Sequence, residues 1–271
     1  MQRSFQQQTL LSHRHLTALL IAFAWPSLAQ ETTLPEKHHF YLYLLVGQSN
    51  MAGRGTVEDQ DKSPHPRVLV LDKNGIWETA AEPLHWDKPS AGVGPGLAFG
   101  REITRLNPKI VVGLIPCAVG GSPVDAWQPG VYFPATRSHP WDDAIQRAKI
   151  AMQKGTLKGI LWHQGESDCK PELAPFYEKK LHSLIQRFRS GLKADGLPFI
   201  AGQMGKFSET PWTPETEHVD KAHRDLPKKI ANTAFVGSEE LNHRGDRLHF
   251  DSRSSRELGR RYAEAMAKFS P

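Results

Sequence analysis

Short apolar runs that alternate with amphipathic segments constrain the fold of this chain more than any other feature. Six runs are nearly continuous in hydrophobicity, as expected of strands that are covered on both faces: Phe40–Val46, Val68–Leu71, Ile110–Ile115, Gly159–Trp162, Pro198–Ala201 and Ala234–Val236. Between or after them, apolar residues recur at helical spacing in four segments: Leu97–Leu106, Trp141–Met152, Phe176–Leu192 and Arg256–Phe269. This alternation predicts an α/β domain with a mostly parallel central sheet between helices.

The N-terminal segment is typical of a signal peptide. Two arginines, Arg3 and Arg14, precede the apolar run Leu16–Trp25, which Pro26 ends. Ser27-Leu28-Ala29 is a small-x-small cleavage pattern. We therefore expect residues 1–29 to be removed and residues 30–271 to form a single domain of a secreted or periplasmic protein. Neither this run nor any later one is long enough to span a bilayer.

Composition argues against several classes of function. The formal net charge is +5, but lysines and arginines are mixed with acidic residues and form no block, so we expect no nucleic-acid partner. The two cysteines, Cys117 and Cys169, are more often bridged than free in an oxidising compartment. Neither lies in a CxxC motif or beside histidines at ligand spacing, so we expect no metal site.

Small polar residues follow three of the predicted strands. Gly47–Gly53 (GQSNMAG) follows the first, Gly120–Ser122 (GGS) the third and Gln164–Glu166 the fourth. Because ligands of parallel sheets bind beyond the carboxyl ends of the strands, we expect the three clusters to converge on one edge. Ser49 is then either the cap of a following helix or a nucleophile at the rim of the sheet.

A nucleophilic serine needs a base, and the base needs an orienting acid. Asp246-Arg247-Leu248-His249 supplies both types, since an acid three residues before a histidine can reach Nδ1 in a tight turn and leave Nε2 for Ser49. Backbone N–H groups of Ser49 and Gly121, with the Gln164 amide as a third donor, could stabilise an oxyanion. Each cluster alone has an ordinary structural explanation, and only their joint placement favours a site.

Four ordered motifs resemble a known family. GQSNMAG (47–53), GGS (120–122), WHQGESD (162–168) and DRLHF (246–250) are similar to the blocks of the SGNH hydrolase superfamily. They look most like its sialate O-acetylesterase-like branch, which includes carbohydrate esterase family six, the acetyl xylan esterases. The resemblance extends from about residue 40 to 265. It implies a three-layer α/β/α, flavodoxin-like domain that removes acetyl groups from sugar hydroxyls through an acyl-serine, without a cofactor.

The resemblance also implies roles for individual residues. Ser49 is the expected nucleophile and His249 the general base, oriented by Asp246 or, alternatively, by Glu166. The expected oxyanion hole consists of the N–H groups of Ser49 and Gly121 and the side chain of Gln164, which stands where many members of the superfamily have asparagine.

Other residues of the predicted loops have two interpretations each. Trp86, Trp127 and Trp212 either stack on sugar rings or seal loops onto the core. Arg54 either binds a substrate carboxylate such as that of sialic acid or is only solvated. The family topology further implies that Cys117 and Cys169 follow strands that lie close enough for a disulfide.

Three other functions could be built on parts of the same sequence pattern. A sugar-binding module without catalysis would lack one of the three catalytic residue types, and all three are present. A nucleotide-binding protein would carry a Lys-Ser/Thr pair or G-x-G-x-x-G after the first strand, and neither is there. A lipid or other short-chain esterase is the remaining alternative, because fold does not fix substrate. The partner that the sequence indicates is an acetylated carbohydrate.

Overall fold

A computed structural model describes Met1 and residues 34–269. Within these residues, seven strands form one sheet in the order β3-β2-β4-β1-β5-β6-β7. Every neighbouring pair is parallel except β2–β3, which is antiparallel. The strands are β1 (Phe40–Gly47), β2 (Val68–Leu71), β3 (Trp77–Thr79), β4 (Val111–Pro116), β5 (Thr156–His163), β6 (Phe199–Gly202) and β7 (Thr233–Val236).

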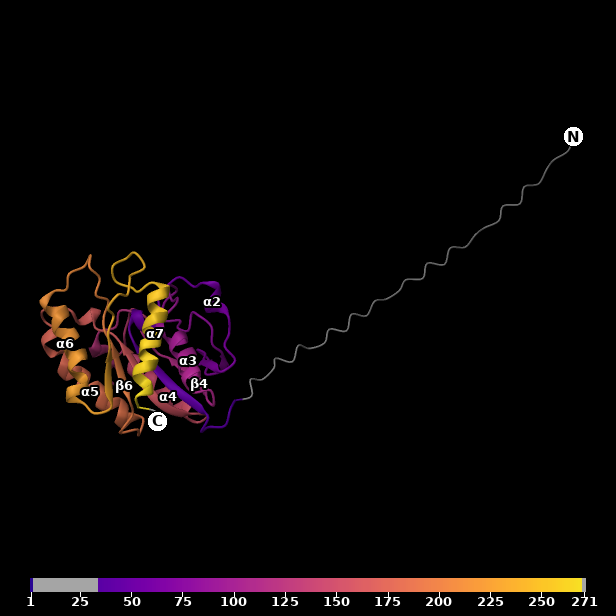
Figure 1. Cartoon of the computed structure of the whole chain (residues 1–271), viewed down its shortest axis with the longest axis horizontal. Helices are drawn as coiled ribbons and strands as arrows, with labels where there is room; N and C mark the ends of the chain where they lie inside the picture. The colour runs from indigo at the N-terminus through magenta and orange to yellow at the C-terminus, as the bar shows by residue number, and fades with distance from the viewer. Residues whose placement is uncertain (2–33, 270–271) are drawn as a thin grey trace. The chain divides into compact units, whose positions relative to one another are not determined.

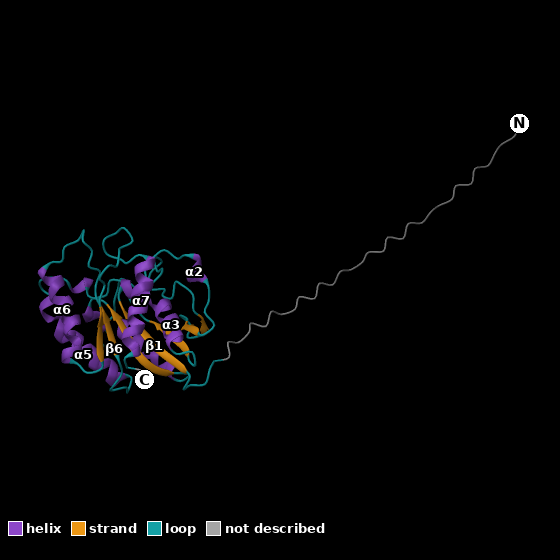
Figure 2. Ribbon diagram, in the orientation of Figure 1, coloured by secondary structure: helices purple, strands orange, loops and turns teal. Residues whose placement is uncertain are grey.

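Helices cover both faces of the sheet (Figures 1 and 2). On one face, α3 (Pro95–Leu106) and α7 (Ser252–Ala267) pack over a core that contains Leu97 and Leu258. On the other, α4 (Pro140–Met152), α5 (Ala174–Gly191) and α6 (Pro214–Lys229) enclose a second core. Short helical turns complete the chain: α1 (Ser49–Ala52), α2 (Asp59–Lys62), η1 (Val124–Trp127) and η2 (Glu166–Asp168). The predicted α/β/α arrangement is confirmed.

The central strand β1 places the three polar clusters on one edge. It lies between β4 and β5, and all of its residues except Tyr41 are buried. Leu45 pairs with Pro116 and Gly47 with His163, so β1, β4 and β5 end side by side. The segments that begin at Gln48, Cys117 and Gln164 therefore emerge at the same carboxyl edge, as parallel pairing requires.

Six strands and four helices occur where the sequence pattern predicted them, and the exceptions have local causes. Helix α7 begins at Ser252, one turn before the predicted start, because the Asp251 side chain caps it by accepting a hydrogen bond from Ser254 N. Helix α6 was not predicted, because two of its five buried residues, Asp220 and His223, are polar. Pro227 also interrupts its helical spacing of apolar residues. The short edge strand β3 also lacks an apolar run.

The predicted signal peptide, residues 1–29, falls outside the described residues apart from Met1, and stays a prediction. Among the residues that the structure describes, none of the helices combines the length and the apolar character needed to cross a membrane.

The crossing of α3 and α7 depends on a glycine. A Cβ atom at Gly259, in the middle of α7, would lie 2.3 Å from the Pro95 carbonyl oxygen and 2.9 Å from Phe99 N. Both are backbone atoms of α3, so no side-chain rotation could relieve the clash. This close approach holds α7, and the loop before it, against the rest of the domain.

Gly259→Ala should destabilise the protein even though alanine is the better helix former by about 1 kcal/mol. We expect the free energy of unfolding to fall by roughly 1–3 kcal/mol, as is usual for overpacking, in urea denaturation. The neighbouring exposed substitution Arg260→Ala is the control and should change it by less than about 0.5 kcal/mol. An equal or more stable Gly259→Ala variant would contradict this packing.

Candidate active site

Ser49 lies directly beyond the end of β1, in a turn that requires glycine. Gly47 has φ +124°, and a Cβ there would lie 2.1 Å from the His163 carbonyl oxygen. Gln48 N donates a hydrogen bond to that same oxygen at 2.8 Å. The chain then enters the four-residue helix α1 at Ser49. The N-cap of this helix is Gln48, which makes no side-chain cap hydrogen bond, and the Ser49 hydroxyl lies against His249 Nε2.

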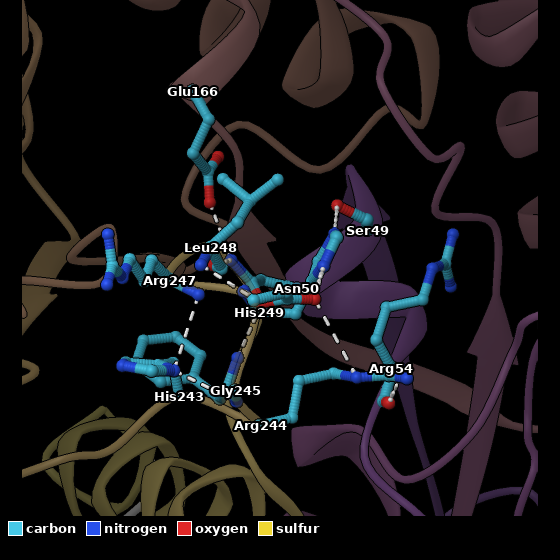
Figure 3. A network of polar contacts seen from close by, with 12 residues as sticks. Ser49, Asn50, Arg54, Glu166, His243, Arg244, Gly245, Arg247, Leu248 and His249 are labelled. Carbon is cyan, nitrogen blue, oxygen red and sulfur yellow. Dashed lines mark hydrogen bonds and ion pairs between the residues drawn. The ribbon is translucent and has the colours of Figure 1, made fainter. Parts of the chain in front are cut away.

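The structure brings Ser49, His249 and Asp246 into a continuous chain of contacts. His249 Nε2 lies 3.0 Å from Ser49 Oγ, and His249 Nδ1 lies 2.8 Å from Asp246 Oδ2. The His249 side chain is 19% exposed and that of Asp246 is 40% exposed, so the group opens to solvent. Figure 3 shows Ser49 and His249 together although they are 200 positions apart in sequence.

The segment 246–249 is a tight turn held by its own aspartate. Asp246 Oδ1 accepts hydrogen bonds from the backbone N–H groups of Leu248 and His249, at 3.0 and 2.8 Å. Burial opposes ionisation of Asp246, but these bonds and the one from the imidazole outweigh it and lower the pKa of the carboxyl. An ionised Asp246 accepts a hydrogen bond from Nδ1–H, which leaves Nε2 free to accept one from the Ser49 hydroxyl.

Asn50 ties the His249 loop to the end of β1. Its Nδ2 donates to the carbonyl oxygen of Leu248 at 3.2 Å, and its Oδ1 accepts from Phe250 N at 3.2 Å. The residues on both sides of His249 are thus fixed by the residue that follows Ser49 (Figure 3). Asn50 was not singled out from the sequence, although it stands inside the GQSNMAG motif.

Glu166, the alternative orienting acid, does not contact the imidazole. Its Oε1 accepts from Asn50 Nδ2 at 2.6 Å, while Oε2 is buried and has no partner among the described residues. Burial raises the pKa of Glu166. The acid that touches His249 is Asp246, and Glu166 acts on the loop through Asn50.

Two backbone N–H groups in the turns that follow β1 and β4 have no acceptor in the described part of the chain. These are Ser49 N, in the first turn of α1, and Gly121 N. Gly121 has φ +82° and is exposed, and a Cβ there would meet only Lys88 Nζ, at 3.8 Å. Both groups fit the expected oxyanion hole.

The structure does not support the expected role of Gln164 as the third oxyanion donor. Its side chain is completely buried, and Nε2 donates to Asp168 Oδ2 at 2.6 Å, to Ser122 O at 3.1 Å and to Gln48 Oε1 at 3.2 Å. The amide has two N–H groups, so these three acceptors use them fully. Gln164 supports the floor of the site instead of facing it.

Arg54, a candidate for the substrate rim, is also not where the sequence suggested: it is neither solvated nor free to bind a substrate carboxylate. It is 5% exposed, and its Nη2 forms an ion pair with Asp87 Oδ2 at 2.6 Å. The same oxygen accepts a hydrogen bond from Gly120 N at 2.8 Å. The pair therefore braces the turn that presents Gly121 N–H. Asp87 was not identified from the sequence, because only the folded loop places it beside Gly120.

The three loop tryptophans divide between the two interpretations. Trp127, a candidate for the substrate rim, is fully buried, donates from Nε1 to Ser122 Oγ at 3.0 Å and packs edge-on against Trp162. It therefore seals its loop onto the core, which is the second of the two interpretations. Trp212 is partly buried and donates to Gly205 O. Trp86 is 45% exposed.

The expected disulfide does not form, because Cys117 and Cys169 are free. Cys117 follows β4 and Cys169 follows β5, and β1 lies between these strands. Two interstrand spacings of about 4.8 Å exceed the reach of a disulfide, whose Cα atoms lie within about 7 Å. Cys169 Sγ instead lies 3.3 Å from Gly165 O and 3.7 Å from Met204 Sδ.

Potential metal ligands gather away from this edge. In the described ranges, Glu36, His38 and His39 have ligand atoms within 4.8 Å of one another, and all three are exposed. They precede β1 and so lie at its amino end, opposite Ser49.

Alkylation measures directly whether Cys117 and Cys169 are free thiols. When the protein is denatured without reduction and alkylated, intact mass spectrometry should show two adducts, one on each cysteine. Reduction before alkylation should leave this number unchanged. Label that enters only after reduction would mean that the pair is bridged.

Substitutions of Arg54 and Asp87 should have non-additive effects on the free energy of unfolding. Either Arg54→Met or Asp87→Asn should lower the free energy of unfolding by about 3–5 kcal/mol, because each leaves a buried charge without its partner. The double variant should lose at least about 1 kcal/mol less than the sum of the singles in urea denaturation. The exposed pair Lys62–Asp59 is the matched control, with coupling near zero. Additive losses at Arg54 and Asp87 would contradict the brace.

Known proteins match this chain over nearly the whole described domain. Residues 39–268 match the family described as carbohydrate esterase, sialic acid-specific acetylesterase. A probable carbohydrate esterase of Arabidopsis thaliana is 32% identical over 246 residues, covering 83% of this chain and 89% of the plant protein. Human sialate O-acetylesterase is 27% identical over 184 residues, which cover 55% of this chain and 35% of the human protein.

Solved structures agree in fold. The Arabidopsis thaliana protein superposes with a TM-score of 0.74 at 30% identity, covering 84% of this chain and 98% of that one. NanS superposes with a TM-score of 0.68 at 20% identity, covering 87% and 99% of the two chains. The chain therefore belongs to the carbohydrate esterase family of sialic acid-specific acetylesterases and is a hydrolase of carboxylic ester bonds.

Proposed function

We propose that this protein removes O-acetyl groups from carbohydrates through an acyl-enzyme formed on Ser49. The observation that carries the proposal is the contact chain from Asp246 through His249 to Ser49 Oγ, with steps of 2.8 and 3.0 Å. These are the distances at which a base can take a hydroxyl proton. Family membership supports the same chemistry.

In the first half-reaction, Ser49 Oγ attacks the acetyl carbonyl carbon while its proton passes to His249 Nε2. The carbonyl oxygen gains negative charge and lies within reach of the N–H groups of Ser49 and Gly121. Asp246 stabilises the imidazolium that forms. When the tetrahedral intermediate collapses, the bond to the sugar oxygen breaks and His249 returns the proton to that oxygen.

In the second half-reaction, water repeats the sequence on the acetyl-serine. His249 takes a proton from the water as its oxygen bonds to the acetyl carbon, and then protonates Ser49 Oγ as acetate leaves. The site opens to solvent at His249, which gives water access. His249 Nε2 carries the transferred proton in both half-reactions: from Ser49 to the sugar oxygen in the first, and from water to Ser49 in the second.

Acetylated xylan or a related neutral glycan is the substrate class that we favour. Arg54 was the residue expected to bind the carboxylate of a sialic acid, and its guanidinium is committed to Asp87. An O-acetylated sialic acid is the second candidate, because a relative of 27% identity is a sialate O-acetylesterase. Export to the periplasm or medium, where such glycans occur, is part of the proposal and depends on the predicted signal peptide.

Acetate release tests the proposal. Wild-type protein should release acetate from 4-nitrophenyl acetate and from acetylated xylan, and Ser49→Ala should reduce turnover by roughly 10⁴-fold or more. Ser183→Ala, an exposed serine on α5, is the control. Faster release from O-acetylated sialic acid would favour the second substrate class. Wild-type protein inactive on all three substrates, or Ser49→Ala at wild-type turnover, would contradict the mechanism.

Replacing each acid separately tests which one orients His249. Asp246→Asn should lower kcat/KM on the aryl ester by about 10²–10⁴-fold, since an amide no longer fixes the Nδ1–H tautomer. Glu166→Gln keeps an oxygen that accepts from Asn50 Nδ2, so its loss should stay below about tenfold. The opposite ranking of the two variants would assign the role to Glu166.

A further inference from the structure

A cavity of about 440 Å³ opens at the same carboxyl edge of the sheet as the proposed active site. It lies between the β2–β3 turn, the segment after β4 and helix α4. Its size falls within the range of small-molecule sites. We call it the Trp86 cavity; its wall includes Asn74, Trp86, Val119, Ser138, Gln146 and Arg147.

Trp86 forms a rigid, exposed platform in this wall. Trp86 is 45% exposed. Arg147 Cζ lies 4.7 Å from the centroid of the Trp86 ring. The guanidinium is itself fixed, since Nη1 and Nη2 donate to the carbonyl oxygens of Asp72 and Leu71 at 2.9 and 2.7 Å. A preorganised aromatic face binds at little entropic cost.

The polar groups around the cavity suit hydroxyl groups better than ions. Thr136, Ser138, Asn74 and Gln146 are neutral donors and acceptors. Of the charged wall residues, Asp87 is paired with Arg54, and Arg147 donates to two backbone carbonyl oxygens. Asp143 accepts a hydrogen bond from His139 N, and both Asp143 and Lys73 are exposed to solvent. His85 is 5% exposed, and its Nε2 has no partner among the described residues. Burial lowers the pKa of His85 to about 4, so the imidazole is neutral at pH 7.

The cavity shares a wall with the oxyanion turn. Val119 lines the cavity, and its N–H donates to Gly47 O, two residues before Ser49, at 2.8 Å. Asp87 also lines the cavity and accepts from Gly120 N. The segment that follows β4 therefore both lines the cavity and bonds to the last residue of β1, two positions before Ser49.

We propose that the Trp86 cavity is a subsite for an uncharged sugar unit of the glycan whose acetylated unit lies at Ser49. The inference rests on the proposed deacetylase function and extends it from a single sugar to an oligosaccharide. One face of Trp86 packs on Arg147, and the exposed part of the ring stacks on the apolar C–H face of the sugar. The neutral side chains and His85 exchange hydrogen bonds with its hydroxyl groups.

Substrates of increasing length test the subsite. Acetate release is measured from mono-O-acetylated xylose, xylobiose and xylotetraose by wild type, Trp86→Ala and Trp86→Tyr. KM of the wild type should fall by about tenfold or more from xylose to xylotetraose. Trp86→Ala should remove this dependence on length, and Trp86→Tyr, which keeps an aromatic face, should restore most of it. Trp212→Ala, a loop tryptophan outside the cavity, should keep it.

A binding measurement separates the subsite from catalysis. Unacetylated xylotetraose is titrated calorimetrically into Ser49→Ala and into Ser49→Ala/Trp86→Ala, and the second variant should bind about tenfold or more weakly. Equal affinity in both, or a wild-type KM that does not change with length while acetate is released, would overturn the subsite and leave the proposed function standing. No acetate release from these substrates would overturn the subsite, and inactivity on 4-nitrophenyl acetate and O-acetylated sialic acid as well would overturn the proposed function.

Discussion

The parallel pairing of β1 with β4 on one side and β5 on the other determines where the residues of the proposed site lie. Leu45 opposite Pro116 and Gly47 opposite His163 set the level at which the three strands end. A slip of one residue would turn the side chains of β1 to the wrong faces. The pairing is specified by burial, because β1 is enclosed by helices on both faces and nearly all of its side chains are inaccessible.

Beneath Ser49, a buried polar network makes this edge rigid. Gln164 donates to Asp168 and accepts from Tyr177 Oη at 2.7 Å, and Tyr177 Oη lies 2.8 Å from His223 Nε2. Burial lowers the pKa of His223 to about 3, so the network contains a neutral imidazole at pH 7. Connected networks of this kind fix a single arrangement of a core. The WHQGESD motif therefore contributes mainly below the site, with Glu166 reaching the His249 loop through Asn50.

Sequence reasoning located six of the seven strands from their local pattern. It identified Ser49, Asp246 and His249 from their expected place at one edge of the sheet together with the family resemblance. It failed where a residue type fits two environments. Arg54 and Trp127 are common both at rims and in interiors, and only the folded loops reveal Asp87 and Ser122 as their partners. The disulfide failed for a different reason: the pattern gives the strands but not their order, and β1 separates the two cysteines. Gln164 stands at the expected strand end, yet its rotamer depends on acceptors up to 116 positions away.

The central claim is that His249 activates Ser49 as a nucleophile. The most direct measurement is covalent labelling by a fluorophosphonate that reacts with activated serines, followed by peptide mass spectrometry of the wild type and of His249→Ala. Our account predicts one adduct, on the peptide that contains Ser49, formed at least about 10³-fold more slowly in His249→Ala. An adduct on another residue, or labelling of Ser49 at the same rate without the imidazole, would contradict it.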